Sequence, residues 1–154
     1  MDLQFMAEAV AEARKGFAAG GIPIGSVLVS NGTVIGRGHN QRVQQGNPIL
    51  HGEMDAIQNA GRLSSKVYAR STLYTTLSPC TMCAGTVILY GIPRVVIGEN
   101  RTVAKTTYCE DWLRSHGVEV VNLDLQECVD LMAEFIRLYP DVWNEDIGRE
   151  HIAG

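Results

Sequence analysis

The dipeptide Asn31-Gly32 is the feature of this sequence that most constrains its fold. It stands between two largely apolar stretches, residues 24–30 and 33–38. Asn-Gly in this position is the strongest short-range signal for a β-hairpin, because both residue types tolerate the positive φ angles of a tight turn. We therefore expect the sheet to begin with an antiparallel pair of strands.

The rest of the sequence alternates between helical and strand patterns. Apolar residues recur every three or four positions over residues 3–17, which indicates an amphipathic helix before the hairpin. Beyond a loop over 39–50, we expect a helix over 52–60 ending at Gly61, a strand over 72–76, a helix opened by Pro79 and running to about Tyr90, a strand over 94–98, a helix over 107–116, a strand over 118–122 and a helix over 125–138. Helices that alternate with strands after a hairpin predict an α/β protein with a mixed five-stranded sheet.

Length and composition exclude several classes of protein. The 154 residues suit a single domain, 1–154, and we find no repeat or linker that divides them. The 13 Lys and Arg residues are outnumbered by 17 Asp and Glu, so the net charge of −4 disfavours a nucleic-acid partner. We expect neither a signal peptide nor a membrane span, because charged residues interrupt the first helix and no apolar stretch is long enough. The four cysteines are then expected to be thiols or metal ligands in a cytoplasmic protein.

Cys80 and Cys83 form a Cys-x-x-Cys pair directly after Pro79. Their spacing places both sulfur atoms on one side of a helical turn. The positive end of the helix dipole lowers the pKa of a thiol there, which favours the thiolate that zinc binds. Taken alone, this motif fits a redox dithiol, a structural zinc site or a catalytic zinc site.

His51 and Glu53 supply what the cysteine pair lacks. Two such positions on a regular helix are rotated by about 200° around its axis. Both can face one ion only if His51 precedes the regular helix, and Gly52 makes such a backbone easy to adopt. We therefore expect His51 to be a metal ligand and Glu53 to point at what the metal holds.

One histidine and two cysteines leave the fourth position of a zinc ion open to water or hydroxide, as in catalytic zinc sites. Two thiolates weaken the ion as a Lewis acid, so the water needs a base, and Glu53 fits that need. The alternative is a closed structural site, for which the candidate fourth ligands are His39, His116, Cys109 and Cys128. Closed sites usually show two paired-ligand motifs, whereas this chain has one.

His-x-Glu followed by Pro-Cys-x-x-Cys is the signature of zinc deaminases. The chain resembles the cytidine-deaminase-like superfamily, and within it the fungal-type cytosine deaminases, from the first helix to about residue 148. Besides the metal motifs, the resemblance rests on Gly-Gly-Ile-Pro-Ile-Gly at 20–25, Gly-Arg-Gly-His-Asn at 36–40, Leu-His-Gly-Glu at 50–53, Thr-Leu-Tyr-Thr-Thr-Leu-Ser-Pro-Cys at 72–80, Tyr-Gly-Ile-Pro-Arg at 90–94 and Glu-Asp-Ile-Gly at 145–148.

The resemblance implies a three-layer α/β/α fold, one Zn²⁺ per chain, a homodimer, and hydrolysis of cytosine to uracil and ammonia in pyrimidine salvage. The substrate would be a small free nucleobase, with no nucleic acid or membrane as partner. Glu53 would carry a proton from the water to the ring and later to the departing amine. Backbone N–H groups near Gly52 and Cys80 are candidates for stabilising the tetrahedral intermediate.

The resemblance also implies which residues contact the substrate. Asn40 would hydrogen-bond the edge of the ring, and Ser78 would offer its backbone carbonyl to the leaving amino group. Residues 139–150 would form a lid in which Asp146 accepts a ring N–H and Trp143 excludes water. From spacing alone, a residue that caps a turn is the better interpretation of Asn40, and the alternative for Ser78 is a helix N-cap. Without the resemblance, the favoured interpretations of Asp146 and Trp143 are a solvated acid and a packed aromatic anchor.

The chain departs from the fungal-type pattern in two places. Those enzymes have a phenylalanine near the position of Val103, and they carry Ile-Ser where this chain has Met54-Asp55. One missing group is worth about 1–3 kcal/mol of discrimination. Isocytosine, creatinine, guanine or a nucleoside are therefore alternative substrates, whereas the acidic charge disfavours a tRNA adenosine deaminase. From another class, a non-catalytic zinc-bearing interaction domain is the alternative, and an intact Glu53 beside an open metal argues against it.

Overall fold

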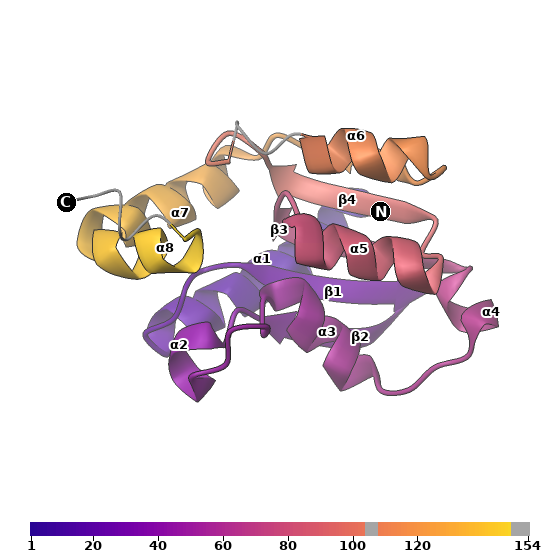
Figure 1. Ribbon diagram of the computed structural model, residues 1–154, viewed down its shortest axis with the longest axis horizontal. Helices are drawn as coiled ribbons and strands as arrows, with labels where there is room; N and C mark the ends of the chain where they lie inside the picture. Colours follow the sequence, from indigo (N-terminus) through magenta and orange to yellow (C-terminus); the bar gives the residue numbers. More distant parts are fainter. Residues whose placement is uncertain (104–107, 149–154) are drawn as a thin grey trace.

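A five-stranded sheet forms the middle layer of the computed structural model, which describes residues 1–103 and 108–148 (Figure 1). Its strands are β1 (Gly25–Ser30), β2 (Thr33–His39), β3 (Ser71–Leu77), β4 (Arg94–Glu99) and β5 (Glu119–Asn122), in the order β2-β1-β3-β4-β5. β1 is antiparallel to both β2 and β3, whereas β3, β4 and β5 are parallel. The mixed five-stranded sheet predicted from the sequence is confirmed.

The hairpin turn lies where Asn31-Gly32 predicts it. Asn31 has a φ of 50° and Gly32 a φ of 74°, so both residues adopt left-handed conformations. The turn pairs Ser30 with Thr33, and the β1–β2 register shifts once, between Leu28 and Val29. This turn fixes which side chains of the two strands face each side of the sheet.

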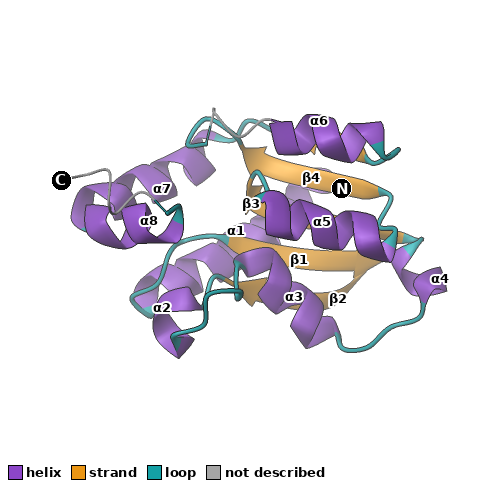
Figure 2. Cartoon of the chain, viewed as in Figure 1, coloured by secondary structure: helices purple, strands orange, loops and turns teal. Residues whose placement is uncertain are grey.

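Helices cover both faces of the sheet (Figure 2). One face carries α1 (Asp2–Ala18) and α7 (Gln126–Leu138), and the other carries α3 (Gly52–Ala60), α5 (Thr81–Tyr90) and α6 (Tyr108–Ser115). Leu73 packs with the α5 and α6 side chains, whereas its neighbour Tyr74 packs against α1, and Val95 and Val96 divide in the same way. The three-layer α/β/α arrangement is confirmed. None of the helices that the structure describes is both long and apolar enough to cross a bilayer.

A third apolar cluster lies past the carboxyl end of β3. It joins Ile24, just before β1, and Leu77, at the end of β3, to Phe135 of α7 and Trp143 of α8 (Pro140–Asp146). Ligands of open α/β sheets bind beyond the carboxyl ends of parallel strands. This cluster therefore forms the apolar floor at the end of the sheet where a site is expected.

Three short helices and one helix boundary differ from the sequence-based expectation. The segment predicted as a loop contains α2 (Arg42–Gln45), and α4 (Ser65–Tyr68) precedes β3; both are too short to show helical periodicity. α8 forms part of the segment predicted as a lid, of which 149–150 lie outside the described residues. α5 begins at Thr81 because Cys80 is its extended N-cap, so Pro79 precedes the helix and does not open it.

Candidate metal centre and active site

Two helix N-termini meet beyond the end of β3. His51 is the N-cap of α3, with φ −64° and ψ 163°, and Cys80 is the N-cap of α5. The extended backbone at His51 releases its side chain from helical geometry, as the spacing of His51 and Glu53 predicts. The side chains of His51 and Glu53 line one pocket together with that of Cys80. The three motif residues thus converge although 29 positions separate His51 from Cys80.

His51, Cys80 and Cys83 form a metal-binding cluster. The Nδ1 atom of His51 lies 3.5 Å from the Sγ of Cys80 and 3.8 Å from the Sγ of Cys83, and the three ligand atoms lie within 4.8 Å of one another. A tetrahedral zinc ion with bonds of about 2.0–2.3 Å separates its nitrogen and sulfur ligands by about 3.6 Å. The cluster has the donor types and the spacing that zinc requires.

The residues considered as a fourth ligand lie outside this cluster. His39 is within 3.2 Å of Glu12, and His116 is exposed beside Ser115. The thiols of Cys109 and Cys128 are buried in the two main apolar cores, which raises the pKa of each. Among the described residues, the metal cluster has three members. That geometry matches an open, catalytic type of zinc site.

Two of the three ligands, Cys80 and His51, favour a positive charge beside them, whereas the hydrogen bond with Cys80 and burial raise the pKa of Cys83. The pKa of Cys80 is lowered to about 4, first by its hydrogen bond with Cys83 and also by His51, although burial opposes the change. Burial lowers the pKa of His51, but the hydrogen bond with Cys80 and the charge of Glu53 outweigh it and raise the pKa to about 9. Cys80 is therefore a thiolate at neutral pH, and a cation beside it is stabilised.

Glu53 is buried at the edge of the same pocket. Only 4% of its surface is exposed, and it belongs to the first turn of α3. Burial raises the pKa of Glu53, against the lowering effect of the nearby His51. A carboxyl group whose pKa is raised binds a proton more readily than an ordinary one, which favours the role of a general acid–base catalyst.

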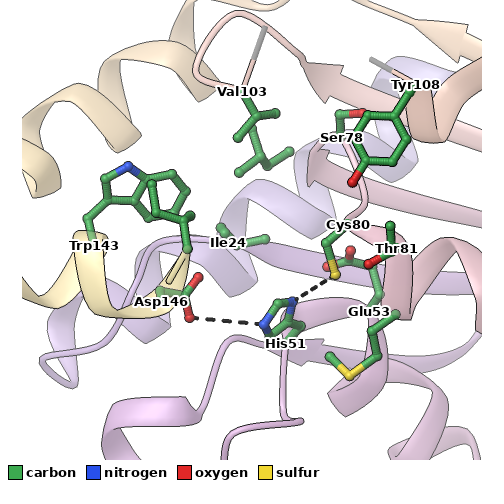
Figure 3. A pocket seen from close by; sticks show the side chains of 13 residues that line it. Ile24, His51, Glu53, Ser78, Cys80, Thr81, Val103, Tyr108, Trp143 and Asp146 are labelled. Atoms are coloured by element: carbon green, nitrogen blue, oxygen red, sulfur yellow. Dashed lines mark hydrogen bonds and ion pairs between the residues drawn. The ribbon is translucent and has the colours of Figure 1, made fainter. Parts of the chain in front are cut away.

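The pocket has a volume of about 300 Å³ and joins apolar walls to a few polar groups (Figure 3). Its apolar lining comes from Ile24, Leu77, Met82, Val103, Trp143 and Ile147, and its polar lining from His51, Glu53, Ser78, Cys80, Thr81, Tyr108 and Asp146. This volume lies at the small end of the range for small-molecule sites. It fits a single small heterocycle.

Asp146 projects from the end of α8 towards the metal cluster. Its Oδ1 atom lies 4.0 Å from the Nε2 of His51 and accepts a 2.7 Å hydrogen bond from Arg42 of α2. Burial raises the pKa of Asp146, although the charges of His51 and Arg42 act in the opposite direction. Trp143, on the same helix, also lines the pocket and is 7% exposed.

Of the other predicted contacts, Ser78 lines the pocket, whereas Asn40 and Gly52 are not among its lining residues. The hydroxyl of Ser78 donates to Glu110 and does not cap α5. Asn40 is fully buried, and its backbone N–H donates to the carbonyl of Ile24. The side-chain oxygen of Asn40 accepts the N–H of Arg42, whereas its Nδ2 has no partner among the described residues. Gly52 packs against the Ile24 backbone.

The departures from the fungal-type pattern separate into two kinds. Val103 lines the pocket, so its size bears directly on what fits. Met54 instead faces α5, where its sulfur accepts a hydrogen bond from Thr86, and Asp55 is buried and accepts the backbone N–H of His39. Neither Met54 nor Asp55 lines the pocket.

The sequence analysis did not identify Arg42 and the buried Glu110 as site residues, nor six of the lining residues: Ile24, Leu77, Thr81, Met82, Tyr108 and Ile147. Arg42 contacts Asp146 across 104 positions, and Glu110 contacts Ser78 across 32. No local sequence pattern predicts contacts between positions so far apart. Thr81 had a usable signal, because it lies inside the Pro-Cys-x-x-Cys motif.

Comparison with known proteins agrees with this geometry. A model of the cytidine and deoxycytidylate deaminase zinc-binding region matches residues 1–99. A cytosine deaminase of Candida albicans is 55% identical over 141 residues, which cover 91% of this chain and 92% of that protein.

Solved structures of related proteins have the same fold. A tRNA:A34 deaminase superimposes with a TM-score of 0.71 at 28% identity, over 84% of this chain and 99% of that one. A guanine deaminase from Nitrosomonas europaea superimposes with a TM-score of 0.69 at 21% identity, over 85% and 82% of the two chains. The second likeness is evidence of shared fold alone.

Proposed function

The chain belongs to the cytidine and deoxycytidylate deaminase family, and we propose that it hydrolyses the free base cytosine to uracil and ammonia. One observation carries this proposal: the open cluster of His51, Cys80 and Cys83 shares a pocket of about 300 Å³ with the buried Glu53. The 55% identity to a cytosine deaminase supports the choice of base.

Glu53 carries the protons in this reaction. The chemistry that a bound zinc supplies is Lewis acidity, which lowers the pKa of a water molecule. Glu53 accepts one proton from the attacking water while the water oxygen bonds to the amino-bearing ring carbon. Glu53 then returns this proton to the adjacent ring nitrogen. A second proton from the same oxygen reaches the amino group through Glu53, the carbon–nitrogen bond breaks, and ammonia leaves as the carbonyl forms.

Asp146 and Asn40 support a free base over a nucleoside. Asp146 offers an acceptor to the pocket, and Asn40 holds a buried amide donor that has no partner among the described residues. In cytosine the ring N1–H and the neighbouring C2 carbonyl form the complementary donor and acceptor. In a nucleoside that nitrogen carries the sugar and has no proton to donate.

The remaining contacts follow from the walls of the pocket. Trp143 and Val103 are proposed to supply apolar surface for the faces of the ring, and the backbone carbonyl of Ser78, another lining residue, is proposed to accept from the amino group that leaves. Backbone N–H groups near Gly52 and Cys80, at the starts of α3 and α5, are proposed to stabilise charge that develops on the ring.

The assembly proposed is a cytoplasmic homodimer of a single domain over 1–154. Its support is an apolar surface on α5 and α6, where Leu89 is 74% exposed and Trp112 is 38% exposed. Trp112 lies over Gly85, one helical turn before Leu89, so the two side chains belong to one patch. Exposed apolar patches of this kind commonly mark protein interfaces. The segment 139–150, with α8 in it, is proposed to act as a lid.

The test is ammonia release from zinc-loaded protein with cytosine, isocytosine, 5-fluorocytosine, cytidine, guanine, adenine and creatinine. We expect one ammonia and one uracil per cytosine consumed, and no turnover of cytidine. Turnover of nucleosides or purines alone would replace the substrate proposed here. No turnover of any compound by zinc-loaded protein would favour a non-catalytic zinc-bearing domain instead.

A further inference from the structure

Arg42 joins the two groups that are proposed to recognise the base. Its backbone N–H donates to the Oδ1 of Asn40 at 3.0 Å. Its side chain donates to the Oδ1 of Asp146 at 2.7 Å and to Glu145 at 3.0 Å. Asn40 and Asp146 are more than 100 positions apart in the sequence. Arg42 links them directly, to Asn40 through its backbone and to Asp146 through its side chain.

The Arg42–Asp146 pair is shielded from water. The side chain of Arg42 is 14% exposed and that of Asp146 is 5% exposed. A charge-assisted hydrogen bond of this length in such surroundings holds its partners more firmly than an exposed ion pair does. Glu145 is different, because its side chain is 48% exposed and its contact with Arg42 is open to solvent.

The bond to Arg42 also selects which oxygen of Asp146 is available. Oδ1 is taken by Arg42, whereas Oδ2 accepts no hydrogen bond from the residues that the structure describes. In the same way, the oxygen of the Asn40 amide is taken by the Arg42 N–H, which leaves Nδ2 as a buried donor. One residue therefore holds both the Asp146 acceptor of the pocket lining and the buried amide of Asn40, which lies outside that lining.

We propose that Arg42 is a positioning residue of the active site, which orients Asp146, and with it the acceptor for the ring N–H, without contacting the substrate itself. This rests on the proposed function, because it takes Asp146 to be a substrate contact. A merely structural alternative exists, in which Arg42 only fastens α8 to α2. The two alternatives differ in whether the effect of Arg42 on substrate binding depends on Asp146.

The first test compares Arg42→Met with Glu145→Gln, using the base that the parent enzyme turns over fastest. Arg42→Met is expected to raise KM about 10- to 100-fold with kcat changed less, because a contact that binds substrate and transition state alike is lost. Glu145→Gln removes only the solvent-exposed ion pair between Arg42 and Glu145, and is expected to leave KM within about twofold. Arg42→Lys, which keeps a charge but not the planar fork, is expected to fall between them.

A double-mutant cycle with Asp146→Asn separates positioning from structure. If Arg42 acts through Asp146, Arg42→Met has little further effect on KM in the Asp146→Asn background. If Arg42 only fastens α8, its bond to Glu145 still does so in the Asp146→Asn background; the two effects then add, and the positioning role is overturned. Zinc content and the fluorescence of Trp143, measured in a Trp112→Phe background, verify that each variant is folded. If Arg42→Met does not fold, Arg42→Lys takes its place in the cycle.

The outcomes distinguish this proposal from the proposed function. A parent enzyme that turns over cytosine, with an Arg42→Met variant of unchanged KM, overturns the role of Arg42 alone. A zinc-loaded parent that is inactive on every base overturns the proposed function and, with it, the substrate contact that Arg42 would position. A parent that prefers another base changes the substrate, and the KM comparison is then decided on that base.

Discussion

The hydroxyl of Ser78 donates a 2.9 Å hydrogen bond to the Oε2 of Glu110, a side chain of α6 that is 4% exposed. The amide of Asn100 donates to the same oxygen at 3.1 Å. Ser78 follows β3 and Asn100 follows β4, so Glu110 ties together the two loops that leave the carboxyl ends of neighbouring parallel strands. One of these loops leads to Cys80 and the other to Val103.

Glu110→Ala is expected to lower the free energy of unfolding by about 2–4 kcal/mol, because the buried Ser78 hydroxyl and the half-buried Asn100 amide lose their acceptor. Urea denaturation of the zinc-loaded protein measures this change. The matched control is Asp111→Ala on the next position of α6, where the side chain is 81% exposed and an effect within about 0.5 kcal/mol is expected. Equal effects for the two variants would show that the Glu110 bonds contribute nothing specific.

Glu53→Ala is expected to lower kcat by about 10²–10⁴-fold or more, because the proton carrier is lost while the ligands stay in place. Zinc content, measured by atomic spectroscopy, should remain near one per chain. Glu53→Gln, which keeps the shape of the side chain, should be equally inactive. Substantial turnover by either variant would remove Glu53 from its role.

Cys83→Ser is expected to lose zinc and activity together, because the metal needs both thiolates. The control is Cys109→Ser, which changes a buried thiol of the core outside the metal cluster. That variant should lose some stability but keep its zinc. Chelation of the parent should likewise abolish turnover, and added Zn²⁺ should restore it. Full activity of metal-free protein would contradict the zinc assignment.

The sequence predicted the parts of the molecule that have local causes. Asn31-Gly32 predicted the hairpin, because turn chemistry belongs to the two residues that form the turn. The sharing of one pocket by His51 and Glu53 followed from the demand that both face one ion. The helix boundary at Pro79 was wrong by two residues, since Cys80 serves as N-cap and the proline lies outside the helix.

What the sequence could not predict depends on distant pairing. α2 has four residues, too few for a periodic pattern, yet it places Arg42 against Asp146. The partner of Ser78 was equally hidden, because an N-cap role was the local expectation and Glu110 enters only through the packing of α6. Val103 was identified from a resemblance, and its place in the pocket wall depends on the path of the chain after β4.

Asp2 and Arg94 give a prediction about pH that is independent of the metal. Arg94 donates to both oxygens of Asp2, at 2.9 and 2.7 Å, and Tyr74 donates to one of them at 2.8 Å. The bond to Arg94 is the main reason why the pKa of Asp2 is lowered from 3.8 to about 2, although burial opposes it. The pair ties the first turn of α1 to β4.

A lowered pKa in the folded state means that the unfolded chain binds the proton first as the pH falls. The stabilisation is therefore fully present above about pH 4 and is lost as the pH falls towards 2. Both side chains are partly exposed, so Asp2→Asn is expected to cost about 0.5–1 kcal/mol at pH 7. Urea denaturation from pH 7 down to the lowest pH at which both proteins fold should show this difference shrinking below pH 4. Asp124→Asn, in the more exposed pair with Arg101, is the control and should change the free energy of unfolding less. A difference between parent and Asp2→Asn that grows as the pH falls would contradict the assigned ion pair.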